Sequence, residues 1–122
     1  MNNITEQLKA RTKTFAKGCI KLLSSSEQKG RLFWHIENQL IRSSTSVAAN
    51  YRAACLAQSK ASFVAKLSIV IEEVDESAFW LELLIEENLT DQEVSTKLYN
   101  EALELTKIFV ASRKTMNNRT NQ

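Results

Sequence analysis

Proline is absent from this chain, and glycine occurs only twice, at Gly18 and Gly30. Their scarcity disfavours a protein built from sheets and tight turns, because these two residues readily supply the fixed or positive φ angles of many turns. Ala, Leu, Glu and Lys, which all favour helices, are abundant instead. We therefore predict an all-α protein. Its 122 residues suffice for one domain with an ordinary hydrophobic core.

Other absences exclude further classes of protein. No run of about 18 apolar residues occurs, so we expect no membrane-spanning helix. The first residues, MNNITEQLKARTK, lack the apolar core of a secretory signal. Cys19 and Cys55 show no metal-ligand spacing and suit a reducing compartment. A cytoplasmic protein is the expectation.

The residues needed for catalysis or metal binding are also scarce. Di-iron helix bundles use Glu-x-x-His pairs, but the only histidine is His35, and Leu32 lies three residues before it. No Ser, Cys or Lys lies in a recognisable catalytic elbow, and neither glycine belongs to a phosphate-binding loop. We expect no enzymatic activity, no cofactor and no metal.

Helix-start signals and apolar spacing predict four helices. We place the helices at about 4–23, 27–57, 60–87 and 91–114. Start signals are found at Asn3 with Glu6, Ser24 with Glu27, Ser59, and Thr90 with Glu93. Residues 1–115 then form one domain, and MNNRTNQ, residues 116–122, forms a polar flexible tail. Short connections favour an up-down-up-down antiparallel four-helix bundle.

Two of these segments carry apolar or small residues at alternating steps of three and four, which is typical of nearly straight bundle packing. In the second segment they are Phe33, Ile36, Leu40, Ser43, Val47, Asn50, Ala54 and Ala57. In the third they are Phe63, Leu67, Val70, Val74, Ser77, Leu81 and Leu84. Similar but shorter series begin at Ile4 in the first segment and at Val94 in the fourth.

The second segment contains a run of small and polar residues, RSSTSVAANYRAA, from Arg42 to Ala54. The apolar spacing continues through it, so we predict a helix surface that packs closely against its neighbours. In an antiparallel hairpin Arg42 lies level with Asp75 and Glu76, and we expect it to pair with a carboxylate there. Ser43, Ser46 and Asn50 are predicted to be structural.

The second and third segments carry further apolar residues beside their main series. They are Ile41, Ala48, Tyr51 and Cys55, and Ile69, Trp80 and Leu83. Either these helices have a wide core face, or they form a self-association surface to which Tyr51 and Trp80 contribute.

Charge is distributed unevenly along the chain. Residues 1–66 contain 11 basic and 3 acidic residues, whereas residues 67–122 contain 5 basic and 11 acidic ones. Such halves can pair internally, pair with a second copy, or attract an anionic partner. The basic candidates for contact with nucleic-acid phosphates are Lys9, Arg11, Lys13, Lys17, Lys21, Arg113 and Lys114. The alternative is an ordinary solvated face.

The segment RSSTSVAANYRAACLAQSKASFVAKLSIVIEEVDESAFWLELL, residues 42–84, resembles the 23S ribosomal RNA intervening-sequence proteins, also called four helix bundle proteins. The matching residues are Arg42, Ser43, Ser46, Asn50, Leu67, Ser68, Glu76 and Leu81. The family often has an acidic residue at the positions of Ala53 and Ser62. The absence of these acidic residues here removes possible local partners for Arg52 and Lys60.

This resemblance implies a bacterial four-helix bundle that assembles as a ring of five copies. Distant relatives are accessory proteins of diversity-generating retroelements, in which a basic ring contacts nucleic acid and a reverse transcriptase. No enzymatic activity is established for the family. The expected function is therefore a nucleic-acid-binding accessory protein that contacts RNA or DNA. The alternatives are a scaffold that docks a partner enzyme, and a passenger of an insertion element without a strong host function.

Overall fold

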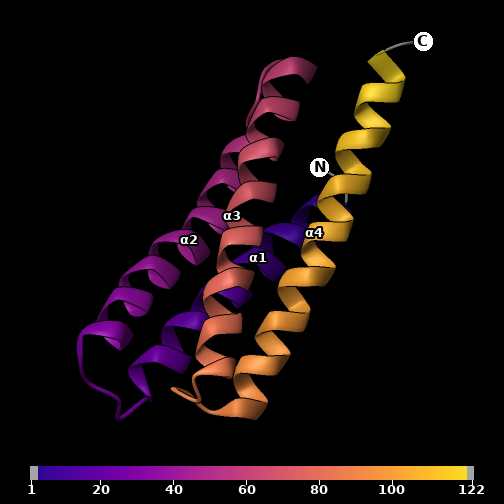
Figure 1. Cartoon of the computed structure of the whole chain (residues 1–122). Helices are drawn as coiled ribbons and strands as arrows, with labels where there is room; N and C mark the ends of the chain where they lie inside the picture. The colour runs from indigo at the N-terminus through magenta and orange to yellow at the C-terminus, as the bar shows by residue number, and fades with distance from the viewer. Residues whose placement is uncertain (1–2, 121–122) are drawn as a thin grey trace.

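The computed structural model describes residues 3–120, which form four α-helices and contain no β-strand. The helices are α1 (Asn3–Ser24), α2 (Arg31–Cys55), α3 (Lys60–Glu86) and α4 (Gln92–Thr120). Figure 1 shows them side by side as a bundle. The α1–α2 and α3–α4 connections lie at one end of the bundle and the α2–α3 connection lies at the other. The all-α prediction is confirmed.

The start of α2 differs from the prediction by four residues. Gly30 immediately precedes the helix with φ 119° and ψ 170°, a backbone conformation that is essentially restricted to glycine. The helix therefore cannot extend back to residue 27. The proposed capping box of Ser24 and Glu27 is wrong, because Ser24 is the last residue of α1.

Replacement of Gly30 by alanine should destabilise the protein. No neighbouring atom lies within 4 Å of the added Cβ, so the cost comes from the backbone alone. Such strain costs about 1–3 kcal/mol, which urea denaturation would measure as a lower midpoint with an unchanged slope. Lys29→Ala, one residue earlier, is the control and should be nearly neutral. Equal stability of the two variants would contradict this account of the α1–α2 turn.

The other helix ends agree more closely with the sequence. Ser59 caps α3, because its Oγ accepts a hydrogen bond from the Ser62 amide at 3.0 Å, as predicted. The cap of α4 is Asp91 rather than Thr90, since the Val94 amide donates to Asp91 Oδ1 at 2.9 Å. Helix α4 runs to Thr120, six residues past the expected end at residue 114. The proposed tail thus begins within a helix, and residues 121–122 lie outside the described range.

The core consists of the predicted apolar series from all four helices, so the predicted pattern is largely confirmed. Its largest fully buried side chains include Phe15, Ile36, Leu40, Leu67, Val70, Leu81, Leu84, Leu105 and Phe109. Two series extend less far than expected, because Ile4 is 67% exposed and Val94 is 42% exposed. Both residues lie in the first turn of a helix, where fewer neighbouring side chains cover them.

Tyr51 belongs to this core and not to an outer surface. Only 5% of it is exposed, and its ring lies 5.1 Å from that of Phe109, measured between centroids. Helix α2 contacts both α1 and α3, so it buries a wider face than one series of steps predicts. The proposed interface role of Tyr51 is therefore corrected.

The polar run in α2 has two structural roles. Ser43 and Ser44 are fully buried, and the Ser43 and Ser77 hydroxyl oxygens lie 2.9 Å apart, joining α2 to α3. The Asn50 side-chain amide bonds within α2 itself, to the Ser46 carbonyl at 3.0 Å and to the Ser46 hydroxyl at 2.8 Å. The run is helical and closely packed, as its spacing predicted.

A buried thiol makes stability depend on alkaline pH. Burial raises the pKa of Cys19 from 9.0 to about 12, although a hydrogen bond with Ser44 partly opposes the shift. The thiol is an acid whose folded pKa is raised, so its contribution is complete below pH 9 and declines as the pH rises from 9 toward 12. The Cys19 thiol alone should lower the free energy of unfolding by about 1.4 kcal/mol between pH 8 and pH 10. Denaturation at pH 8 and at pH 10 measures this change. In Cys19→Ala the difference in unfolding free energy between the two pH values should be smaller by about the same amount.

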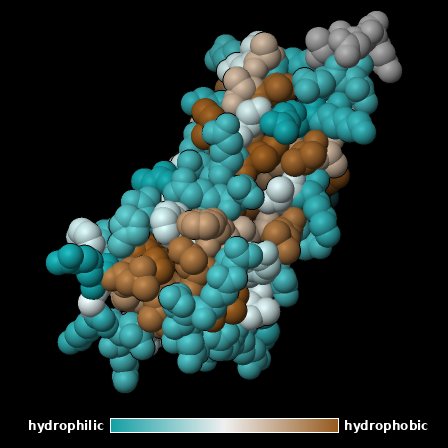
Figure 2. Space-filling view, in the orientation of Figure 1, coloured by the Kyte–Doolittle hydropathy of each residue, from teal (hydrophilic) through white to brown (hydrophobic). Residues whose placement is uncertain are grey.

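The additional apolar residues of α2 and α3 fall into two groups. Cys55, Ile71, Trp80 and Leu83 are partly buried and pack against the core. Ile41 and Ile69 remain 37% and 39% exposed, and Phe79, which the apolar spacing did not single out, is 50% exposed. Figure 2 shows apolar side chains gathered over the lower parts of α2 and α3, and again between the upper parts of α3 and α4. A wide core thus accounts for the first group only.

No helix in the described part of the chain has the length and hydrophobicity needed to cross a bilayer.

Candidate nucleic-acid interface

A groove between α1 and α2 collects several of the predicted basic residues. It has a volume of about 640 Å³, and Lys9, Lys13 and Lys17 of α1 line it together with Arg52 of α2. The small residues that line it are Ala10, Ala16, Thr45, Ala48 and Ala49. Thr45, Ala48 and Ala49 come from the polar run in α2. The side of the run that faces α1 therefore helps to form the groove.

The local sequence explains the arrangement of the lysines. On a helix, residues four positions apart are offset by about 40°, so Lys9, Lys13, Lys17 and Lys21 form a row that drifts around α1. Its last member, Lys21, lies outside the α1–α2 groove and lines a separate pocket with Asp91, Val94 and Leu98. We call this row the lysine stripe. Lys13 and Lys17 are exposed, and neither forms an ion pair with any residue in the range 3–120. Lys9 pairs with Glu6 at 3.2 Å, and Glu6 is the one carboxylate that lines the groove.

Arg11 lies beside the lysine stripe but has a different role. Its Nε and Nη2 atoms donate to the Glu101 carboxylate at 2.7 and 2.8 Å, which joins α1 to α4. The hydrogen bond to Glu101 raises the pKa of Arg11, and the negative charge of Glu101 adds to this effect. A bidentate pair occupies the guanidinium donors that a phosphate would need. The structure thus uses Arg11 as a tie between helices.

The basic residues near the end of α4 do not join the groove. Arg113 is partly buried and donates to the Ser68 hydroxyl of α3 at 3.2 Å. Lys114 is exposed. Neither residue lines the groove between α1 and α2. The structure therefore divides the predicted basic residues between an α1–α2 groove and the end of α4.

Arg42 meets carboxylates of α3, as the sequence predicted. It donates to Glu73 at 3.1 Å and also to Glu76, and the hydrogen bond to Glu76 contributes most to raising the Arg42 pKa. Trp80 Nε1 donates to the same Glu76 carboxylate at 3.1 Å and places its ring edge-on to His35. Glu73 takes the place that the sequence assigned to Asp75, because it lies one turn before Glu76 on the same side of α3.

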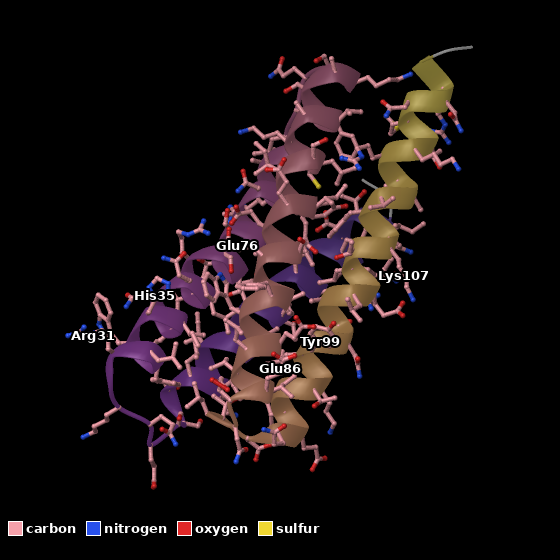
Figure 3. The ribbon with its side chains drawn as sticks, viewed as in Figure 1. Arg31, His35, Glu76, Glu86, Tyr99 and Lys107 are labelled. Atoms are coloured by element: carbon pink, nitrogen blue, oxygen red, sulfur yellow. The ribbon has the colours of Figure 1, made fainter. Side chains whose placement is uncertain are left out.

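This Arg42 cluster is a structural feature of the α2–α3 surface, where Figure 3 labels Glu76 and His35. Half of the Arg42 side chain is exposed, at 51%, so solvent weakens both ion pairs. No group of three or more His, Cys, Asp or Glu residues within 3–120 is arranged to hold a metal ion.

The fold and the groove define a class: a small helical-bundle protein that presents a row of lysines beside a shallow, small-residue groove. The chain belongs to the 23S rRNA-intervening sequence protein family, whose model matches residues 6–111. A solved structure of similar fold is a protein of unknown function from the S23 ribosomal protein family of Bacteroides thetaiotaomicron. It is 33% identical, with a TM-score of 0.80, over 90% of this chain and 97% of that one. No curated protein matches the chain.

Proposed function

We propose that this protein is a non-enzymatic, nucleic-acid-binding accessory protein that uses the α1–α2 groove to contact the phosphate backbone of RNA or DNA. The observation that carries this proposal is the pair of exposed, unpaired lysines, Lys13 and Lys17, in a groove with two further cations and one carboxylate. Phosphate backbones bind such rows of positive charge with little dependence on base sequence.

The proposal includes a cytoplasmic location in a bacterium, an antiparallel topology and self-association as a ring of five copies. Family membership supports the ring and the bacterial source. The short connections, located alternately at the two ends of the bundle in Figure 1, support the antiparallel topology. The exposed apolar residues of α2 and α3 support self-association.

A titration at two salt concentrations tests the proposed binding. Purified protein is added to a fluorescently labelled RNA hairpin and, separately, to a labelled DNA duplex, while anisotropy is followed at about 50 and 200 mM salt. The expected result is binding at the lower salt concentration and a strong loss of affinity at the higher one. No binding at either concentration would refute the proposal. Binding that is insensitive to salt would also refute it, because contacts to phosphate release counterions.

A further inference from the structure

Helix α3 carries a row of negative charge that corresponds in length to the lysine stripe. Glu72, Asp75, Glu82 and Glu86 are all exposed and, with Phe79 between them, follow one another at steps of three and four residues. We call this row the carboxylate stripe. At 1.5 Å per residue it spans about 21 Å, and the lysine stripe of α1 spans about 18 Å. Each stripe contains four charges of one sign.

The carboxylate stripe is chemically incomplete within a single chain. None of its four carboxylates forms an ion pair with another residue in the range 3–120. At its centre Phe79 is 50% exposed, and it lines a depression of about 220 Å³ with Asp75, Glu82, Tyr99 and Leu103. The negative charge of Glu82 is the main cause that raises the pKa of Tyr99. Exposed apolar surface bordered by unpaired charge of one sign is typical of a surface that another molecule covers.

The two stripes cannot meet within one bundle. Helix α1 packs beside α2 and α4, and α3 packs beside the same two helices, whereas no Cα atoms of α1 and α3 come within 8 Å of each other in residues 3–120. The stripes therefore lie on diagonally opposed helices. The pairs Arg11–Glu101 and Arg42–Glu76 join neighbouring helices without using a residue of either stripe, and Lys9 is the one stripe residue that forms an ion pair within residues 3–120. In Figure 3, Glu86 and Tyr99 mark the α3–α4 side, away from Arg31 and His35 on α2.

We infer that the carboxylate stripe of one copy docks on the lysine stripe and α1–α2 groove of a second copy. The small residues of the groove leave room for Phe79 and Leu103, and Lys9, Lys13 and Lys17, which line the groove, meet carboxylates of the second copy. A second copy is the occupant that the observations favour, because both complementary surfaces are present on the same chain. The contact joins two different surfaces, so its repetition produces a ring or a filament.

This inference rests on the self-association included in the proposed function and adds a consequence for nucleic-acid binding. The second copy and the phosphate backbone require the same lysines, Lys13 and Lys17. They therefore compete for the groove, and nucleic acid binds where a neighbouring copy is absent or displaced. Assembly of the protein then controls access to its own binding site.

Charge reversal on either stripe, followed by reversal on both, tests the contact. The full-length variants are K13E/K17E, D75K/E82K and the fourfold combination, which has the same net charge as the natural chain. Molar mass would be measured at 50 mM salt by light scattering after gel filtration, on protein freed of nucleic acid and checked for helix content by circular dichroism. Each double variant should self-associate at least tenfold more weakly than the natural chain. The fourfold variant should regain assembly, because its two stripes are again opposite in sign.

Several results would overturn the inference. They are a natural chain that is monomeric, double variants that retain its mass, and a fourfold variant that stays dissociated. The nucleic-acid proposal is judged separately with the labelled RNA hairpin. The informative variant is D75K/E82K, because its lysines are intact and no neighbour covers them. If it dissociates but does not bind the hairpin, the nucleic-acid proposal alone is refuted. A protein that binds the hairpin while both double variants keep their mass refutes only the stripe contact.

Discussion

Replacing Phe109 with alanine should lower the free energy of unfolding by about 3–5 kcal/mol. Phe109 is fully buried, is among the largest side chains of the core, and packs against the ring of Tyr51. Its removal leaves a cavity that the surrounding helices only partly fill. The loss of stability therefore includes the transfer free energy of the buried ring and the van der Waals contacts that the cavity walls no longer make. Loss of the aromatic contact with Tyr51 adds to the effect. Urea denaturation followed by circular dichroism measures the difference.

Val110→Ala is the matched control for this experiment. Val110 follows Phe109 on α4 but is 40% exposed, so its truncation should change stability by less than about 1 kcal/mol. The contrast between the neighbours tests which face of α4 is directed to the core. A loss below about 1 kcal/mol for Phe109→Ala would show that α4 does not pack as described.

The double variant K13E/K17E should bind the RNA hairpin about a hundredfold more weakly than the natural chain at 50 mM salt. Each phosphate contact contributes a slope of about −0.9 in log affinity against log salt. Two lost contacts remove a slope of about −1.8, and multiplied by the logarithm of 0.05 M this corresponds to roughly two orders of magnitude in affinity. The salt slope itself should fall by about two units. Anisotropy titrations at four or five salt concentrations between about 50 and 200 mM would give both quantities.

K97E/K107E is the matched control, because it makes the same change in net charge elsewhere. Lys97 and Lys107 lie on α4, are each 75% exposed, and pair with Glu93 and Glu104 of their own helix. This control should retain most of its affinity if binding occurs in the α1–α2 groove. Equal losses for the two variants would show that net charge, and not the groove, determines binding.

The sequence predicted the helices well where the local chemistry determined them. The apolar series of α2 and α3 depends only on spacing along one helix, and the Ser59 cap depends on one side chain and a nearby amide. The start of α2 was misjudged, since both the Ser24–Glu27 pattern and Gly30 are compatible with a helix. Only the φ angle of Gly30 shows which alternative the chain adopts.

The candidate site was predicted in part for a similar reason. The lysine stripe follows from a four-residue repeat, which places successive members on neighbouring parts of the α1 surface whatever α1 packs against. That Lys9, Lys13 and Lys17 line the α1–α2 groove while Lys21 does not depends on the packing of α1. The separation of Arg11 from this set could not be predicted, because its partner Glu101 is 90 residues away in the sequence. Arg42 pairs with Glu73 and not with the predicted Asp75. This choice likewise depends on how α2 and α3 are rotated against each other.

The sequence by itself determined the all-helical class, the buried faces of the helices and the uneven charge, since these follow from composition and periodicity within single segments. The tertiary structure decided which charges pair inside the bundle and which remain unpaired. It buried Tyr51, tied Arg11 to Glu101, and located the lysine and carboxylate stripes on opposed helices. These outcomes depend on distances between segments far apart in the chain, and such distances exist only once the helices have packed.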